Sequence, residues 1–197
     1  DIAFLQYTSG STAVPKGVMV SHHNLMVNSR AFEEGMSIAA DDIFVSWLPL
    51  YHDMGLIGGL LQPLHRGVPV ILMTPKFFIE RPVRWLEVIS RYRATVSGAP
   101  NFAFQLCADR VRNSQLQTLD LSCWRVAFCG AEPVRRNTMR TFVERFKSAG
   151  FSAGTIYPCY GLAEATLFVT GGVRGEGMKA QEFSPEVLAQ GKAEQDE

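Results

Sequence analysis

The chain has 197 residues, and its 19 lysine and arginine side chains balance its 19 aspartate and glutamate side chains. A hydrophobic content of 47% is enough to build a core and argues against intrinsic disorder. The balanced charge argues against a nucleic-acid-binding surface or a polybasic membrane surface, and no apolar run approaches the roughly 20 residues that a membrane-spanning helix needs. Because the chain begins at Asp1 without an initiator methionine or a leader, we expect a piece of a longer, cytoplasmic protein.

The first half of the chain alternates strand and helix signals. A strand is predicted at 2–7, and a loop rich in Gly, Ser and Thr leads to a short return strand at 18–20. Ser21 is a good N-cap for a helix that we expect to stop at Gly35. The next expected elements are a strand at 43–48, a helix over 52–61, a strand at 68–73 and a helix from Pro82 to about Arg93 with Trp85, Val88, Ile89 and Tyr92 on one face.

The second half continues the alternation. A strand is predicted at 94–97, and Asn101 is expected to cap the helix that follows it. Pro133 is expected to open a helix that Gly150 stops, between strands at 124–129, 155–160 and 167–170. Strands separated by such helices predict βαβ units: an α/β fold with a largely parallel sheet flanked by helices. The remaining residues, 173–197, are polar and offer one short helix from Ser184.

The four cysteines give no sign of a disulfide framework or a metal site. Cys107, Cys123, Cys129 and Cys159 form no C-x-x-C pair, and their spacing to the histidines is not that of metal ligands. We therefore expect reduced, buried thiols.

A dense cluster of anion-binding residues follows the first strand. Residues 8–17 read T-S-G-S-T-A-V-P-K-G, which offers hydroxyl and backbone N–H donors together with the charge of Lys16. This is not a Walker A loop, because Pro15 precedes the lysine and Gly17 follows it. The composition predicts a phosphate-binding loop, and we expect the segment 9–17 to be mobile when no nucleotide is bound.

At this loop the sequence resembles the adenylate-forming enzymes, which include acyl-CoA synthetases, luciferases, peptide-synthetase adenylation domains and fatty acyl-AMP ligases. Two more stretches agree in order and spacing, L-P-L-Y-H-D-M-G at 48–55 and Y-G-L-A-E-A-T at 160–166. The turn Gly130, Ala131, Glu132, Pro133 resembles the adenine-binding turn of these enzymes. The resemblance covers 1–172 and implies an AMP-binding part of the large N-terminal domain.

Within that group the chain looks most like the fatty acyl-AMP ligases. The sequences of residues 47–59, 77–86 and 97–104 are similar to those of the fatty acyl-AMP ligases. Residues 178–193 resemble the start of the insertion that these ligases carry. In the resembling enzymes the insertion is thought to disfavour transfer to coenzyme A, which leaves transfer to a carrier protein or a downstream synthase domain. We therefore interpret 173–197 as the start of such an insertion or as a flexible tail.

The resemblance implies a reaction and a set of site residues. A fatty acid carboxylate attacks the α-phosphorus of ATP, pyrophosphate leaves, and an acyl-adenylate remains. The phosphates would be held by Thr8, Ser9, Gly10, Ser11, Thr12 and Lys16. Adenine would be framed by Gly130, Ala131, Glu132, Pro133 and Tyr160. Gly161, Leu162 and Ala163 would also belong to the nucleotide-binding site. Glu164 would bind Mg²⁺, and His52 would lie near the carboxylate and the α-phosphate.

Several of these roles have simpler alternatives. Glu164 could be a solvated surface acid, and Tyr160 a core residue at the end of a strand. Asp53 could orient His52 or only cap the next helix. His22 and His23 are expected to lie in the first turn of a helix without a catalytic role. The apolar side chains that could line an acyl tunnel, or simply form core, are Met54, Leu56, Ile57, Leu60, Phe102, Phe104 and Leu106.

The chain departs from the resembling enzymes at one position. Many of them have threonine immediately before the metal-binding glutamate, where this sequence has Ala163. The ribose-binding aspartate and the C-terminal domain with its catalytic lysine are expected beyond residue 197. The alternatives that stay open are an acyl-CoA synthetase and a nucleotide-binding or interaction module without activity of its own.

Overall fold

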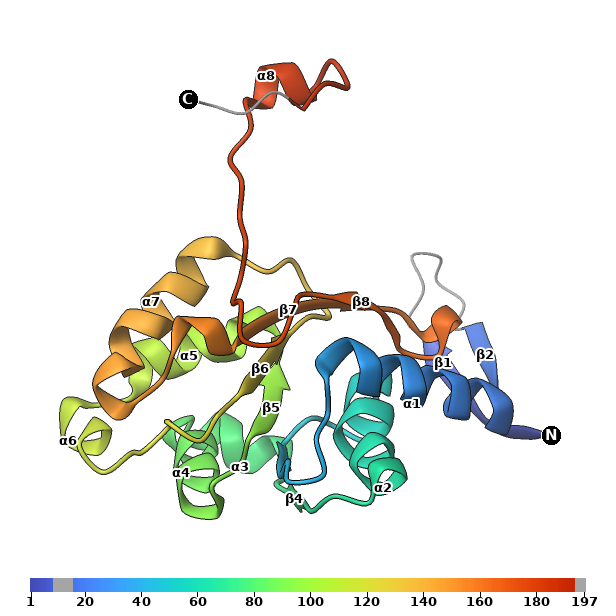
Figure 1. Cartoon of the computed structure of the whole chain (residues 1–197), viewed down its shortest axis with the longest axis horizontal. Helices are drawn as coiled ribbons and strands as arrows, with labels where there is room; N and C mark the ends of the chain where they lie inside the picture. The colour runs from blue at the N-terminus through green and yellow to red at the C-terminus, as the bar shows by residue number, and fades with distance from the viewer. Residues whose placement is uncertain (9–15, 194–197) are drawn as a thin grey trace.

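A computed structural model describes residues 1–8 and 16–193 of the chain. Its main sheet has six strands in the order β4-β3-β5-β6-β7-β8 (Figure 1). Every neighbouring pair in this sheet is parallel except β7 and β8, so the predicted α/β fold with a largely parallel sheet is confirmed. The strands are β3 (Phe44–Ser46), β4 (Val70–Leu72), β5 (Val96–Ala99), β6 (Val126–Cys129), β7 (Ile156–Gly161) and β8 (Phe168–Gly171).

Helices cover both faces of the sheet, which explains why its central strands are buried and apolar. In Figure 1, α1 and α2 lie on one side of the central strands, and α4, α5 and α7 lie on the other. The helices are α1 (His22–Met36), α2 (Gln62–Arg66), α3 (Pro75–Glu80), α4 (Val83–Tyr92), α5 (Asn101–Arg110), α6 (Asn113–Leu116), α7 (Arg136–Phe146) and α8 (Pro185–Leu188). A π-helix, η1 (Met54–Leu61), precedes α2.

A separate hairpin carries the two ends of the predicted phosphate loop. Strands β1 (Ile2–Thr8) and β2 (Lys16–Ser21) pair antiparallel, with Thr8 opposite Lys16. Ser21 then caps α1 in a capping box with Asn24, as the sequence predicts for this residue. Residues 9–15 themselves, and the mobility expected of them, lie outside the described part of the chain.

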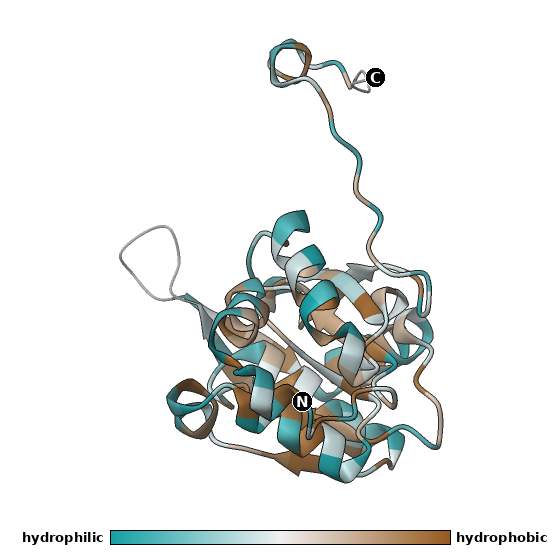
Figure 2. Cartoon of the chain, turned by 90° about the vertical axis from the view of Figure 1, so that its left-hand side faces the viewer, coloured by the Kyte–Doolittle hydropathy of each residue, from teal (hydrophilic) through white to brown (hydrophobic). Residues whose placement is uncertain are grey.

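The core is built from aromatic side chains between the sheet and the helices α4, α5 and α7. Trp85 and Trp124 meet edge to face at a centroid distance of 5.2 Å, and both contact Phe104. Both of these indole N–H groups find an acceptor: Trp85 Nε1 donates to Ser97 Oγ at 2.8 Å, and Trp124 Nε1 donates to the carbonyl of Val126. Figure 2 shows that the hydrophobic segments gather in the globular part, while the segment leading to α8 is mostly hydrophilic or neutral.

Element boundaries differ from the sequence predictions at three helix ends. Helix α1 passes Gly35 and ends at Met36, and Ser37 adopts the left-handed conformation in place of the glycine. Asn101 begins α5 rather than capping it, and its Oδ1 accepts a hydrogen bond from the Arg135 amide. Residues 130–135 are irregular, and α7 begins at Arg136 and not at Pro133.

The expected apolar face of α4 is also partly wrong. Trp85 and Ile89 are buried as predicted, but Tyr92 is 45% exposed, and Leu86 is buried in its place. The short helices α2, α3 and α6 have no counterpart in the sequence predictions. Among the described residues, no helix is long and apolar enough to cross a membrane.

Candidate active site

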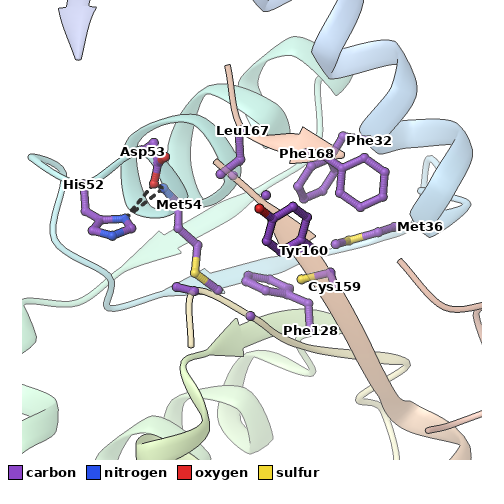
Figure 3. A pocket seen from close by; sticks show the side chains of 14 residues that line it. Phe32, Met36, His52, Asp53, Met54, Phe128, Cys159, Tyr160, Leu167 and Phe168 are labelled. Atoms are coloured by element: carbon purple, nitrogen blue, oxygen red, sulfur yellow. Dashed lines mark hydrogen bonds and ion pairs between the residues drawn. The ribbon is translucent and has the colours of Figure 1, made fainter. Parts of the chain in front are cut away.

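The principal cleft opens where β6 and β7 end, the edge at which parallel sheets usually bind ligands (Figure 3). It brings together segments that are far apart in the chain. Its lining residues are Phe32, Met36, His52, Asp53, Met54, Gly58, Phe128, Gly130, Ala131, Cys159, Tyr160, Gly161, Leu167 and Phe168. Three of the motifs singled out in the sequence therefore meet in one cleft.

His52 and Asp53 form a contact pair at the entrance to η1. His52 Nδ1 lies 2.8 Å from Asp53 Oδ1, and the same oxygen accepts a hydrogen bond from the Met54 amide at 2.6 Å. Asp53 thus contacts the imidazole and also caps the helix, so capping is not its only contact. The hydrogen bond to Asp53 raises the pKa of His52 against the opposing effect of burial.

The turn after β6 is fixed by close backbone approach and by one carboxylate. A Cβ on Gly130 would lie 2.8 Å from the Cys159 carbonyl oxygen, so glycine is required there. Ala131 has a φ of 64°, a left-handed conformation that is unfavourable for residues with a Cβ. Glu132 Oε1 accepts a hydrogen bond from the Phe102 amide at 2.6 Å. Gly130 and Ala131 line the cleft, whereas Glu132 and Pro133 do not.

The end of β7 presents an aromatic ring to the cleft. Tyr160 is 58% exposed, so it is not the core residue that the sequence left open as an alternative. Gly161 also lines the cleft, and a Cβ there would lie 2.1 Å from the Leu167 carbonyl oxygen. Leu162 and Ala163 follow outside the lining, and Ala163 is buried.

Glu164 lies on a short 3-10 turn, Ala163–Ala165, between β7 and β8. Its side chain is exposed and lies outside the cleft lining. Over residues 1–8 and 16–193, no group of three histidine, cysteine or carboxylate side chains forms a metal site. Mg²⁺ needs only one or two protein carboxylates when substrate phosphates supply further oxygens, so a single exposed glutamate suits this ion.

Two of the predicted phosphate-binding residues mark the ends of the loop. Thr8 is half-buried and Lys16 is exposed, and they face each other across the hairpin. Ser9, Gly10, Ser11 and Thr12 lie outside the described residues. The buried side chain of Gln6 connects the hairpin to the histidine segment, because its Nε2 donates to the Tyr51 carbonyl at 3.2 Å.

Sequence reasoning missed Gln6, and it also missed Asn28 on α1, whose side chain contacts the β7–β8 connection. Neither residue belongs to a motif. The only available signal was a polar side chain within an otherwise periodic strand or helix.

A second, apolar cleft adjoins the first. It shares His52, Met54 and Ala131 with the principal cleft and extends to Phe102 on α5 and Ile79 on α3. Of the side chains predicted for an acyl tunnel, Met54 and Phe102 line this cleft, while Ile57 and Phe104 are buried in the core. Leu56, Leu60 and Leu106 are partly buried and line neither cleft.

The remaining candidates behave largely as expected. All four cysteines are free, but only Cys107 and Cys129 are fully buried, while Cys123 and Cys159 are largely but not completely buried. Burial raises the pKa of the Cys159 thiol to about 12, so this cleft-lining cysteine is not a reactive thiolate at neutral pH. His22 and His23 lie exposed in the first turn of α1.

Comparison with known proteins places these features in a family. The sequence profile of the AMP-binding enzymes matches residues 1–188. A medium-chain-fatty-acid–[acyl-carrier-protein] ligase of Teredinibacter turnerae is 50% identical over 192 residues, which cover 98% of this chain and 30% of the relative. A ligase of the same description from Moorena producens is 47% identical over 95% of this chain and 32% of its own length.

Solved structures agree with the sequence relatives. The fatty acid AMP ligase of Legionella pneumophila superposes with a TM-score of 0.89 at 51% identity, over 95% of this chain and 33% of that one. One structure from a study of the fatty acyl-adenylate ligases of E. coli and L. pneumophila superposes with a TM-score of 0.96 at 46% identity, over 99% of this chain and 36% of that one. The chain therefore spans about a third of the length of the proteins it matches.

Proposed function

The chain belongs to the AMP-binding enzyme family, and we propose that it is the central segment of a longer ligase that activates a fatty acid with ATP. The products are an acyl-adenylate and pyrophosphate, and the acyl group then passes to a carrier protein or a synthase domain. One observation carries this proposal: a cleft that joins the histidine, glycine-turn and tyrosine motifs opens beside an apolar cleft, and His52 belongs to both.

The division of the two clefts matches the two halves of an acyl-adenylate. The principal cleft offers the exposed Tyr160 ring and the backbone of Gly130 and Ala131, which suit a flat heterocycle such as adenine. The second cleft is lined by Trp47, Phe102 and other apolar side chains, which suit an alkyl chain. The reacting carboxylate and α-phosphate would meet where the clefts join, at His52.

Charge compensation is what this reaction requires of the protein. A carboxylate oxygen forms a bond to the α-phosphorus while the bond to the pyrophosphate oxygen breaks, so negative charges are brought together and redistributed. In the proposed site a protonated His52, whose pKa Asp53 raises, donates a hydrogen bond to the oxygens at the junction. Lys16 and the loop residues Thr8, Ser9, Gly10, Ser11 and Thr12 hold the departing pyrophosphate.

Glu164 is the proposed protein ligand of Mg²⁺. When bound, this ion would neutralise phosphate charge, and its remaining ligands would be phosphate oxygens and water. Leu162 and Ala163 contribute backbone beside the nucleotide rather than side chains in the cleft. Because Ala163 has no hydroxyl group, any contact to the α-phosphate at this position comes from the backbone.

The segment 173–197 is proposed to be the start of the insertion that the fatty acyl-AMP ligases carry. Figure 1 supports this, because the chain leaves the sheet after β8 and reaches α8 well away from the globular part. Arg136 on α7 forms an ion pair with Glu182 in this segment. A cytoplasmic location remains part of the proposal.

Product analysis with the longer ligase tests the proposal. The enzyme is incubated with a medium- or long-chain fatty acid, ATP and Mg²⁺, and each reaction contains either coenzyme A or the carrier protein as the acyl acceptor. The products are identified by mass spectrometry. We expect acyl-adenylate, and acyl transfer to the carrier protein but not to coenzyme A. Transfer to coenzyme A would favour an acyl-CoA synthetase, and absence of acyl-adenylate would favour a module without adenylating activity.

A further inference from the structure

The connection that carries Glu164 is held from outside by one side chain of α1. Asn28 Nδ2 donates to the Phe168 carbonyl at 2.8 Å and to the Ala165 carbonyl at 3.2 Å, and Asn28 Oδ1 accepts from the Phe168 amide at 3.0 Å. The Asn28 residue is only 9% exposed, so these bonds are largely shielded from water. A single amide group thus saturates three backbone groups about 140 positions away in the sequence.

The connection needs such support because its backbone is irregular. The β7–β8 ladder shifts register between Tyr160 and Gly161, and the Leu162 amide closes the connection by donating to the Leu167 carbonyl. Within the turn, the Ala165 and Thr166 amides donate only to carbonyls three residues earlier. Thr166 adopts φ 74° and ψ −58°, which is strained for a β-branched residue. A residue keeps such a strained φ/ψ conformation only where contacts with the surrounding structure hold it there.

Helix α1 is well placed to impose this geometry. Phe32, one turn after Asn28, packs on Phe168 with a centroid distance of 5.5 Å (Figure 3), and Tyr157 donates from its hydroxyl to the Gly35 carbonyl at 2.8 Å. The helix is therefore docked on β7 and β8 along two turns. The position of Ala165 and Phe168 relative to this helix sets the position of Glu164, which lies between the strands.

We propose that Asn28 is a positioning residue that fixes the Glu164 turn for metal binding. This inference rests on the proposed role of Glu164. Asn28 bonds the backbone of Ala165 and Phe168 and would act on a bound ion only through the position that it gives to the Glu164 carboxylate. Loss of such a partner is expected to weaken metal binding by about tenfold or more.

The test compares variants of the longer ligase in two measurements. In the first, pyrophosphate release is measured across a Mg²⁺ titration for Asn28→Ala and Glu164→Gln. Asn24→Ala serves as the matched control, because it removes a polar contact from the first turn of the same helix without touching the β7–β8 connection. We expect Asn28→Ala to raise the half-saturating Mg²⁺ concentration by about tenfold, with the KM for the fatty acid unchanged, and Asn24→Ala to leave both unchanged.

The second measurement is amide hydrogen exchange of the same variants without ligands. Asn28→Ala should accelerate hydrogen exchange at the Leu162 and Phe168 amides, while the amides of β6 exchange at the wild-type rate. Equal exchange at Leu162 and Phe168 in both proteins, or a Mg²⁺ dependence that Asn24→Ala alters as much as Asn28→Ala does, would overturn the positioning role. If Glu164→Gln leaves the Mg²⁺ dependence unchanged, the metal role of Glu164 fails; accelerated exchange in Asn28→Ala then still identifies Asn28 as the support of the turn.

Discussion

His52 lines both clefts, and its hydrogen bond to Asp53 raises its pKa. Its Nδ1 faces Asp53, so the opposite ring nitrogen, Nε2, is the one free to meet a substrate. The pair also affects stability. Because the pKa of His52 is raised in the folded protein, the pair stabilises the folded state fully below about pH 6.5. This stabilisation is lost as the pH rises through the pKa that His52 has in the folded protein.

Replacing Asp53 with asparagine should lower the pKa of His52 toward its ordinary value, because the negative charge that favours the imidazolium is removed. The measurement is a proton NMR titration of the His52 ring. Asp41→Asn is the control, since Asp41 pairs with Arg125 and not with a histidine. A His52 pKa that does not change in Asp53→Asn would show that burial, and not the ion pair, governs this residue.

Glu164 and Lys16 are predicted to contribute unequally to adenylation by the longer ligase. Glu164→Gln keeps the side-chain volume but removes the charge, and we expect a loss of about 100-fold, because one metal ligand affects every phosphate that the metal contacts. Lys16→Ala should reduce the rate less, and His23→Ala should be nearly silent. Pyrophosphate release is measured across a Mg²⁺ titration, with unfolding curves for each variant. If Glu164→Gln changes neither folding nor pyrophosphate release, Glu164 is only a surface acid.

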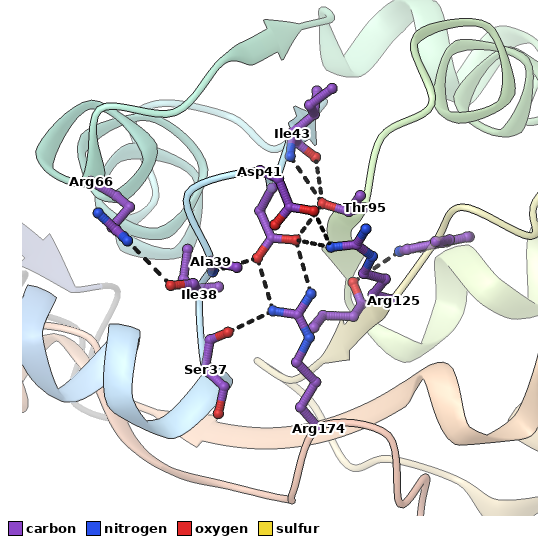
Figure 4. Close-up of polar contacts among 12 residues, drawn as sticks. Ser37, Ile38, Ala39, Asp41, Ile43, Arg66, Thr95, Arg125 and Arg174 are labelled. Atoms are coloured by element: carbon purple, nitrogen blue, oxygen red, sulfur yellow. Dashed lines mark hydrogen bonds and ion pairs between the residues drawn. The ribbon is translucent and has the colours of Figure 1, made fainter.

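At the scale of elements, a buried ion pair holds the end of β8 to the connection between α1 and β3. Asp42 is fully buried and receives two hydrogen bonds from Arg174, at 2.8 and 2.9 Å, and one each from Thr95 and the Ala39 amide (Figure 4). Burial raises the pKa of Asp42, but these bonds outweigh burial and hold the pKa below its usual value. The resulting stabilisation is present above the ordinary carboxyl pKa and is lost as the pH falls through the folded-state value.

Arg174→Ala should destabilise the protein by about 3–5 kcal/mol, because it leaves a buried carboxylate with incomplete compensation. Urea unfolding at pH 7 measures the change, and Arg30→Ala on the exposed face of α1 is the control. A loss no larger than that of the control would mean that Arg125, 3.6 Å from Asp42, compensates the charge on its own.

The alternation of strands and helices could be predicted because the buried central strands are short apolar runs and because helices α4 and α7 each have a periodic apolar face. What sequence reasoning could not supply is the long-range polar contacts. Asn101 reads as a helix cap, but its acceptor is used by Arg135 in the next βα unit. Gln6 and Asn28 read as ordinary polar residues, and only the folded chain brings them to Tyr51 and Phe168. The site motifs were visible because they are local, whereas their supports are not.

On the scale of the whole molecule, the chain holds two adjoining clefts but about a third of the length of its relatives. Under the proposed function, the catalytic machinery includes a lysine that these 197 residues do not supply. Losing such a positioned charge typically costs several kcal/mol of transition-state stabilisation.

The 197-residue chain alone should therefore form no acyl-adenylate at a useful rate. The assay is pyrophosphate release with a long-chain fatty acid, ATP and Mg²⁺, with the longer ligase as the positive control and circular dichroism to verify folding. Turnover by the short chain comparable with that of the longer ligase would show that these residues contain the complete catalytic machinery.

In the proposed function, the two clefts hold the two halves of one acyl-adenylate. A crystal structure of the longer ligase with a non-hydrolysable acyl-adenylate analogue tests this most directly. We predict that adenine lies between Tyr160 and the Gly130–Ala131 backbone, that the alkyl chain runs past Met54 and Phe102, and that the mixed-anhydride position faces His52. Adenine bound away from Tyr160, or an alkyl chain outside the cleft lined by Trp47 and Phe102, would refute this assignment of the two clefts.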